Sequence, residues 1–110
     1  MISVIMSAYN DENNVKLAIE SIQNQSYQDF EFLIMDDFSS DNTFEICKNY
    51  SNEDDRITVY QNNSNLGLTK SLNKLLESAK GDYIARQDSD DISLSERFSK
   101  QIKFISENKL

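Results

Sequence analysis

Four short apolar runs alternate along the whole chain with segments in which apolar residues recur every three or four positions. The runs are rich in β-branched and aromatic residues and lie at 2–6, 30–35, 57–60 and 83–85. Runs without a polar face are typical of strands that are buried on both sides of a parallel sheet. The helical patterns between and after them lie at 15–22, 42–50, 68–79 and from 93 onward. The order βαβαβαβα predicts an α/β fold with right-handed crossovers, a parallel-sheet three-layer αβα sandwich.

The ends of two helices carry sequence signals. The spacing Ser93-x-x-Glu96 is that of a capping box, so we expect the last helix to begin there. Gly81 follows the clearest helical stripe, and we interpret it as the residue that stops this helix. The inward-facing residues predicted for these two helices are Leu68, Leu72, Leu75, Leu76 and Ala79 in the first, and Phe98, Ile102 and Ile105 in the second.

The composition of the chain excludes several classes of partner and of catalytic or metal site. A length of 110 residues indicates one domain, residues 1–110. Eleven basic against 19 acidic residues give a net charge of −8, which argues against nucleic acid or anionic lipid as the main partner. The single cysteine, Cys47, excludes an internal disulfide, and we interpret it as a core residue. Histidine is absent, which excludes both Ser-His-Asp chemistry and metal sites with histidine ligands. Any bound metal must therefore be held by oxygen atoms.

No stretch of the sequence has the character of a membrane span. The longest apolar runs, at 2–6 and 32–35, are far shorter than the ~20 residues that a bilayer requires. The N-terminus also lacks the basic start and apolar stretch of a secretory signal. We therefore expect a cytoplasmic protein.

Acidic and aromatic residues follow three of the predicted strands. Tyr9 follows the first, Asp36-Asp37 ends the second, and Asp88-Ser89-Asp90-Asp91 follows the fourth. Ligands of open α/β sheets bind at the carboxyl ends of the strands, so these residues converge if the first strand lies between the other two. Two carboxylates ~4 Å apart repel by ~1 kcal/mol in water, and a divalent ion such as Mg²⁺ or Mn²⁺ relieves this repulsion. Each segment taken alone also fits an ordinary helix cap or turn.

Four segments in order resemble the nucleotide-sugar-binding half of the family 2 glycosyltransferases, which have the Rossmann-like GT-A fold. The resemblance covers essentially all 110 residues. Each motif alone is a weak signal, but four with suitable spacing are specific. The segments are 2–10 (ISVIMSAYN), 30–41 (FEFLIMDDFSSD), 65–68 (NLGL) and 81–91 (GDYIARQDSDD).

The resemblance implies roles for five residues. Ser7 and Tyr9 match a turn whose members contact the nucleobase and ribose, and Asp37 matches an acid that accepts a hydrogen bond from the base, often from N3–H of uracil. Asp88 and Asp90 match the Asp-x-Asp motif. Its first acid lies by the ribose or a metal-bound water, and its last ligates Mn²⁺ or Mg²⁺, so both are assigned to the metal and Asp88 also to the nucleotide.

The chain departs from the family pattern at two positions. Ser7 stands where proline is usual, which makes the turn less rigid. Leu72 stands where many members carry arginine, so one contact to the diphosphate is either absent or supplied by Lys70.

The implied activity is inverting, metal-dependent transfer of a sugar from a nucleoside diphosphate, with UDP favoured, to a hydroxyl acceptor. The acceptor class is a saccharide or lipid-linked precursor of bacterial surface polysaccharide, with any membrane attachment through regions outside this chain. In the family the catalytic base lies in a second half, so we expect it beyond Leu110 and assign no catalytic residue here. We expect the 110-residue chain to bind donor and metal weakly and to transfer little or no sugar.

Three other classes of protein fit parts of the pattern. A phosphoacceptor signalling domain needs its acidic pair after the first strand, and an Asp-x-Asp phosphohydrolase needs that motif after the first strand; here both motifs come later. A non-catalytic nucleotide-binding or scaffold module with the same fold remains the open alternative, because fold alone does not specify function.

Overall fold

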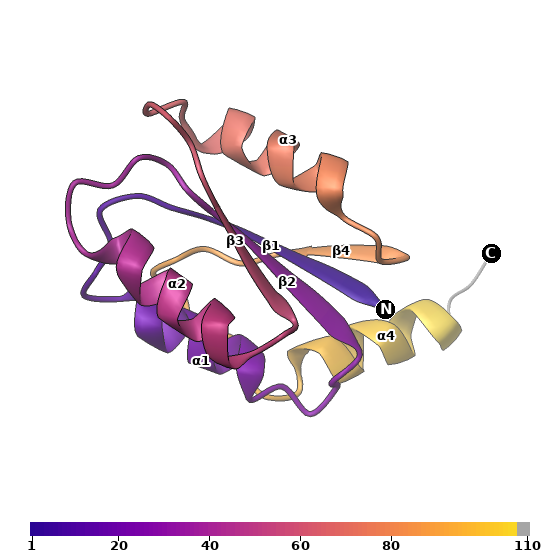
Figure 1. The fold of residues 1–110 in the computed structure, drawn as a ribbon. Helices are drawn as coiled ribbons and strands as arrows, with labels where there is room; N and C mark the ends of the chain where they lie inside the picture. The colour runs from indigo at the N-terminus through magenta and orange to yellow at the C-terminus, as the bar shows by residue number, and fades with distance from the viewer. Residues whose placement is uncertain (108–110) are drawn as a thin grey trace.

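The computed structural model describes residues 1–107, which form a four-stranded sheet flanked by four helices (Figure 1). All neighbouring strands are parallel, and their order across the sheet is β3-β2-β1-β4. The α/β prediction is confirmed, and the first strand does lie between the second and the fourth. In chain order the elements are β1 (Ile2–Ala8), α1 (Val15–Gln23), β2 (Phe30–Asp36), α2 (Thr43–Glu53), β3 (Ile57–Gln61), α3 (Leu68–Ser78), β4 (Tyr83–Arg86) and α4 (Arg97–Glu107).

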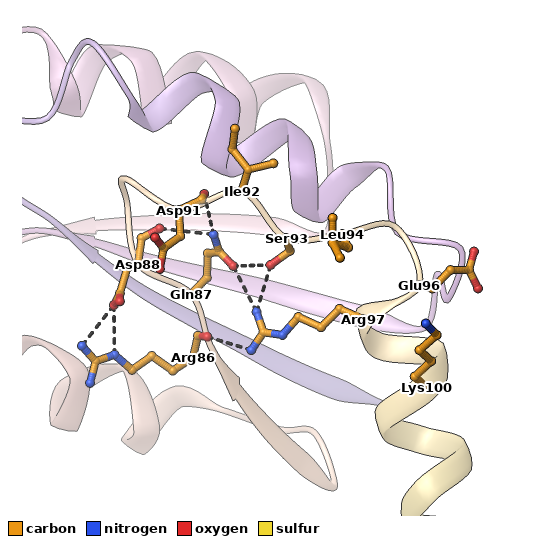
Figure 2. A pocket seen from close by; sticks show the side chains of 10 residues that line it. All are labelled: Arg86, Gln87, Asp88, Asp91, Ile92, Ser93, Leu94, Glu96, Arg97 and Lys100. Atoms are coloured by element: carbon orange, nitrogen blue, oxygen red, sulfur yellow. Dashed lines mark hydrogen bonds and ion pairs between the residues drawn. The ribbon is translucent and has the colours of Figure 1, made fainter.

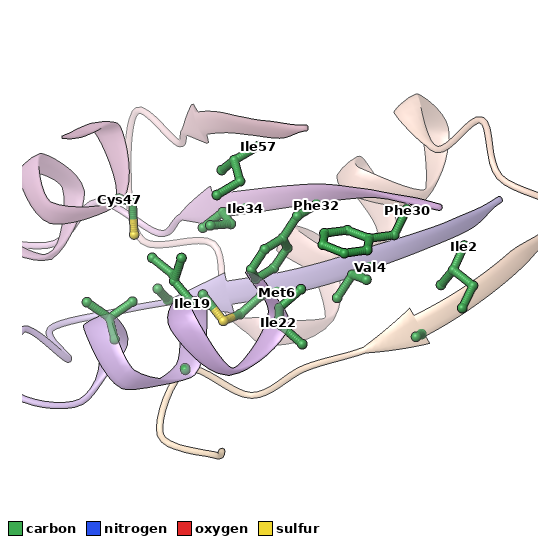
Figure 3. Packing of buried hydrophobic residues seen from close by; sticks show 14 of the residues in the cluster. Ile2, Val4, Met6, Ile19, Ile22, Phe30, Phe32, Ile34, Cys47 and Ile57 are labelled. Carbon is green, nitrogen blue, oxygen red and sulfur yellow. The ribbon is translucent and has the colours of Figure 1, made fainter. Parts of the chain in front are cut away.

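The sheet separates two apolar layers of unequal size. Helices α1, α2 and α4 cover one face and α3 covers the other (Figure 1). Successive strand residues point to opposite faces, so alternate residues of the central strands reach each layer. The larger layer includes Val4, Met6, Phe32, Ile34, Ile19, Ile22 and Cys47 (Figure 3). Phe98 of α4 also belongs to it. The smaller consists of Ile5, Leu33 and Met35 with Leu75 of α3, and Leu72 and Ala79 pack against it.

Two residues of the predicted stripe on α3 do not face the sheet. Leu68 is 47% exposed and Leu76 is 43% exposed, so their assignment to the core is wrong. A single helix on a narrow sheet buries only the residues nearest the strands. On α3 these are Ser71 and Leu75, and the two exposed leucines lie to the sides of that line.

Gly81 is required for close packing, not for stopping α3. The helix ends at Ser78, and the Gly81 N–H donates to the Ser3 hydroxyl at 2.7 Å. A β-carbon at Gly81 would lie 2.7 Å from the backbone carbonyl of Met1 and from the backbone N and the Oγ of Ser3. The glycine therefore allows the chain entering β4 to approach β1.

The predicted capping box of α4 is also wrong. The helix begins at Arg97, four residues after Ser93. The Ser93 hydroxyl donates to the side-chain oxygen of Gln87 at 2.6 Å, and its oxygen accepts from the Arg97 guanidinium at 3.0 Å and not from a backbone N–H of the helix. Within residues 1–107, every helix is too short or too polar to cross a bilayer.

Candidate functional site

The sheet order brings the ends of three strands together at one edge. The Asp37 N–H donates to the carbonyl of Ala8 at 2.9 Å, which places the residue after β2 beside the end of β1. The Gln87 N–H donates to the carbonyl of Ile5 at 2.9 Å, which places the residue after β4 on the other side of β1. The predicted site residues therefore come from neighbouring strand ends, as the sequence pattern required.

Asp37 is almost completely buried and holds the loop that leads into α3. One carboxylate oxygen accepts hydrogen bonds from the Leu66 N–H at 2.8 Å and the Asn62 side-chain amide at 2.9 Å. The other oxygen accepts from the Gly67 N–H at 2.9 Å. Burial alone would raise the pKa of Asp37, but these bonds outweigh it and hold the pKa below its ordinary value. The Ser71 hydroxyl is a fourth hydrogen-bonding partner and also lowers this pKa. Asp37 is therefore an anion at neutral pH.

Asp36 is fully buried on the other side of the strand end and has no free surface for a ligand. One oxygen accepts from the Ser39 hydroxyl at 2.6 Å, and the other from the Ser39 N–H at 3.0 Å and the Gln61 side-chain amide at 3.3 Å. Its role is to shape the turn after β2.

The turns after β1 and β2 are tied to each other. The Asn10 N–H donates to the Ser39 hydroxyl at 2.9 Å, and the Asn10 side-chain oxygen accepts from the Ser40 N–H at 2.8 Å. Tyr9 is half exposed beside this junction. Ser7, one of the predicted nucleotide contacts, is partly buried near the end of β1, where it pairs in register with Met35.

The Asp-Ser-Asp loop, residues 88–90, carries carboxylates that are more exposed than Asp36 and Asp37. Asp88 pairs with Arg86, whose Nε and Nη2 lie 3.1 and 3.0 Å from one carboxylate oxygen, and both side chains are about half exposed. The Ser89 hydroxyl donates to Asp11 at 2.6 Å and so joins this loop to the one that follows β1. Asp90 is exposed and makes no hydrogen bond or ion pair with any residue in the range 1–107.

A cavity of about 630 Å³ opens between the Asp-Ser-Asp loop and the start of α4 (Figure 2). Of the predicted site residues, only Asp88 lines it. Its floor is organised by Gln87, which is 2% exposed. The Gln87 side-chain oxygen accepts from Ser93 and from Arg97 at 3.0 Å, and its amide donates to the carbonyl of Asp91 at 2.7 Å. The Arg97 guanidinium also donates to the carbonyl of Arg86 at 2.9 Å, and burial lowers the pKa of Arg97.

Sequence reasoning missed Gln87 and Arg97. Neither has a motif of its own, and a glutamine just before an acidic loop resembles any solvated turn residue. The one available signal was position, because Gln87 directly follows β4 at an edge of the sheet where ligands bind.

The acidic residues suit a divalent ion that is coordinated partly by this chain and partly by a second molecule. Within residues 1–107, no three or more carboxylate or thiol groups are gathered closely enough to enclose a metal. Mg²⁺ is commonly held by one or two carboxylates together with substrate phosphates and water, and Mn²⁺ accepts the same oxygen donors. Two carboxylates of this loop fit such a partial ligand set, because Asp90 has no hydrogen-bond or ion-pair partner within residues 1–107 and the Asp88 side chain is held by an exposed ion pair.

Comparison with known families decides what kind of protein this is. The sequence model described as "Glycosyl transferase family 2" matches residues 3–110. The chain belongs to glycosyl transferase family 2. The family expected from the four motifs is therefore confirmed over nearly the whole chain.

Two curated relatives in this family are well matched. EpsE of Bacillus subtilis (strain 168), whose name marks it as a candidate glycosyltransferase, is 46% identical over 109 residues, covering 98% of this chain and 39% of EpsE. The Escherichia coli enzyme named UDP-Glc:alpha-D-GlcNAc-diphosphoundecaprenol beta-1,3-glucosyltransferase WfaP is 36% identical over 110 residues, covering 100% of this chain and 43% of WfaP. The chain thus spans about two fifths of the length of these relatives. Other relatives carry teichuronic acid biosynthesis or O-antigen biosynthesis in their names.

Solved structures have the same fold. TarS (residues 1–349) of S. aureus in complex with UDP-GlcNAc has a TM-score of 0.89 and 32% identity, covering 96% of this chain and 31% of TarS. The mannosyltransferase PcManGT of Pyrobaculum calidifontis, solved with GDP-Man and Mn²⁺, has a TM-score of 0.89 at 19% identity, covering 99% of this chain and 33% of that protein. The second likeness shows the fold alone. The expected GT-A fold is confirmed by both.

Proposed function

We propose that this chain is the donor-binding portion of a glycosyltransferase that takes a sugar from a UDP-sugar in the presence of Mn²⁺ or Mg²⁺. The observation that carries the proposal is the state of Asp90 in a family 2 chain: it is an exposed carboxylate after β4, and no residue in the range 1–107 bonds to it. The UDP-sugars in the TarS complex and in the name of WfaP support UDP as the nucleotide.

Each predicted residue takes a role that its surroundings allow. Asp90 and Asp88 are the metal ligands, and Asp88 becomes available when its exposed pair with Arg86 opens. Such a pair contributes no more than about 1 kcal/mol, so opening it costs little. Bound there, the divalent ion supplies positive charge that offsets the charge of the leaving diphosphate. Asp37 accepts a hydrogen bond from the base, and Ser7 and Tyr9 contact base and ribose.

The remaining roles belong to parts of the relatives that this chain does not match. The acceptor site and the base that deprotonates the attacking hydroxyl lie outside residues 1–110, and inversion at the anomeric carbon is part of the proposal. The acceptor in this proposal is a saccharide on a lipid carrier, as the name of WfaP states for that enzyme. The proposal also places the reaction on the cytoplasmic side of the membrane.

The test is calorimetric titration of the 110-residue chain with UDP, with and without Mn²⁺. We expect binding that requires the metal and that weakens by more than about tenfold in Asp90→Ala, since Asp90 is exposed and its loss leaves the fold intact. Asp55→Ala is the matched control, because Asp55 is also exposed but precedes β3 at the opposite edge of the sheet.

Absence of binding to UDP and to GDP with Mn²⁺ would refute the proposal and favour the scaffold alternative. A second assay measures UDP release from UDP-sugars by the same chain, with a saccharide acceptor present. We expect little or none, and robust transfer would refute the assignment of the base to a region outside this chain.

A further inference from the structure

Phe38 has a backbone conformation that is unfavourable for its residue type. Its φ angle is +64°, in the left-handed region that favours glycine and is rare for a bulky side chain. Asn10 is the only other non-glycine residue in residues 1–107 with a positive φ, and asparagine tolerates that region much better. Strain of this kind persists only where the surrounding structure imposes it, and it is concentrated at functional sites.

Hydrogen bonds on both sides of Phe38 impose the conformation. On one side the Asp37 N–H is bonded to the carbonyl of Ala8. On the other side the N–H and the hydroxyl of Ser39 both donate to the buried Asp36. The turn is therefore fixed whichever residue stands at position 38, and glycine would fit it best.

Within residues 1–107, the Phe38 ring makes no core contacts that would offset the backbone strain. Phe38 is 54% exposed and belongs to neither apolar layer, in contrast to Phe30, Phe32 and Phe98, which are at most 3% exposed. An exposed ring on a strained backbone, without core contacts, is explained more simply by a ligand than by stability.

A second half-exposed ring lies at the same strand ends. Tyr9 directly follows Ala8 and Phe38 directly follows Asp37, and these two preceding residues are joined by the hydrogen bond between β1 and β2. Tyr9 is 50% exposed. Two rings thus flank the carboxyl ends of neighbouring parallel strands, the edge at which such sheets bind nucleotides.

We infer that Phe38 is a base-stacking residue, which together with Tyr9 holds the nucleobase of the donor between two aromatic side chains. Every nucleobase offers a flat face, so stacking adds affinity without selecting the base, and selection is left to the Asp37 carboxylate. The inference rests on the proposed function. It adds to that function a contact made by Phe38, which stands at a position whose backbone conformation is suited to glycine.

The decisive variant is Phe38→Gly, because the inference predicts effects of opposite sign on stability and on binding. Removing the strain raises the melting temperature of the free chain. Removing the ring weakens binding of UDP with Mn²⁺ by about tenfold, the lower part of the range for loss of one stacked aromatic. Phe38→Tyr keeps a ring and retains binding within about twofold. Leu17→Ala, which shortens an equally exposed apolar side chain on α1, changes neither quantity.

A ligand without a base separates stacking from other effects. Pyrophosphate with Mn²⁺ binds at the Asp-Ser-Asp loop alone. Phe38→Gly therefore leaves the affinity for pyrophosphate unchanged and lowers the affinity for UDP. Equal affinity of Phe38→Gly and wild type for UDP would overturn the inference and leave the proposed function standing, provided that Asp90→Ala loses binding. Equal losses for UDP and pyrophosphate would also overturn it. If wild type binds no nucleotide, both the proposed function and this inference are refuted.

Discussion

Replacing Asp37 by asparagine tests whether its main role is to hold the loop before α3. The change keeps size and shape but leaves one acceptor oxygen where the carboxylate has two, and it turns an NH₂ group towards a backbone N–H. Asp37 accepts from Leu66, Asn62 and Gly67. Hydrogen bonds to a charged group contribute about 1.5–3 kcal/mol each. Loss of one and weakening of the others gives a decrease of about 2–4 kcal/mol in the free energy of unfolding.

Urea unfolding of the ligand-free chain, followed by far-UV circular dichroism at pH 7, measures this decrease. The corresponding fall in melting temperature is about 8–16 °C. Asp55→Asn is the control, because an exposed aspartate without a partner changes stability by less than about 0.5 kcal/mol.

The pH dependence of the same difference identifies the charge as its cause. Folding lowers the pKa of Asp37, so its contribution is complete above the unfolded pKa of about 3.9 and is lost as pH falls through the lower folded pKa. Asparagine does not titrate. The stability difference between wild type and Asp37→Asn is therefore largest above about pH 5 and shrinks towards pH 2. A difference below about 0.5 kcal/mol at pH 7, or one that does not change between pH 7 and pH 3, would refute the structural role.

Three further predictions concern other parts of the fold. Gly81→Ala places a β-carbon 2.7 Å from the backbone N and the Oγ of Ser3, so it lowers the free energy of unfolding by about 2 kcal/mol in the same urea assay; a change within about 0.5 kcal/mol would contradict the close approach. Arg86→Gln frees Asp88 from its ion pair, so calorimetry shows Mn²⁺ alone binding about two- to fivefold more tightly, and weaker binding would show that the arginine does not compete with the metal. Burial raises the pKa of the Cys47 thiol to about 12, so labelling by a thiol reagent at pH 8 follows global unfolding, and rapid labelling of the native chain would contradict this burial.

The order of the elements was predictable because its signals are local. Val15, Ala18, Ile19 and Ile22 recur at helical spacing in the sequence, and all four are fully buried in α1. The position of β1 between β2 and β4 was only a condition for the residues after these strands to meet, and the structure fulfils it. Ridges of apolar residues and strand ends are properties of short segments, so one sequence is sufficient to recognise them.

The start of α4 was not predictable, because residues far away in the chain determine it. Gln25, which is 1% exposed, accepts a hydrogen bond from the Phe98 N–H at 3.0 Å and donates to the carbonyl of Leu94 at 2.7 Å. These partners are about 70 positions from Gln25 in the sequence. Local capping chemistry at Ser93 was a reasonable expectation, but a buried glutamine that needs partners outweighs an exposed cap, since an unsatisfied buried amide costs more than a missing cap.

The two acidic segments show why a motif predicts the location of a carboxylate better than its role. Asp37 and Asp90 both follow strands and both match family motifs, yet the first is buried and hydrogen-bonded and the second has no partner within the described residues. The difference arises from the loop at 62–67, whose N–H groups reach back to Asp37, whereas no donor within residues 1–107 reaches Asp90. Under the proposed function, a cation and its phosphates bind at Asp88 and Asp90, whereas Asp37 holds the loop before α3 and contacts the base. The difference between the two carboxylates follows from the hydrogen bonds that the fold makes to each, and residue type alone does not reveal it.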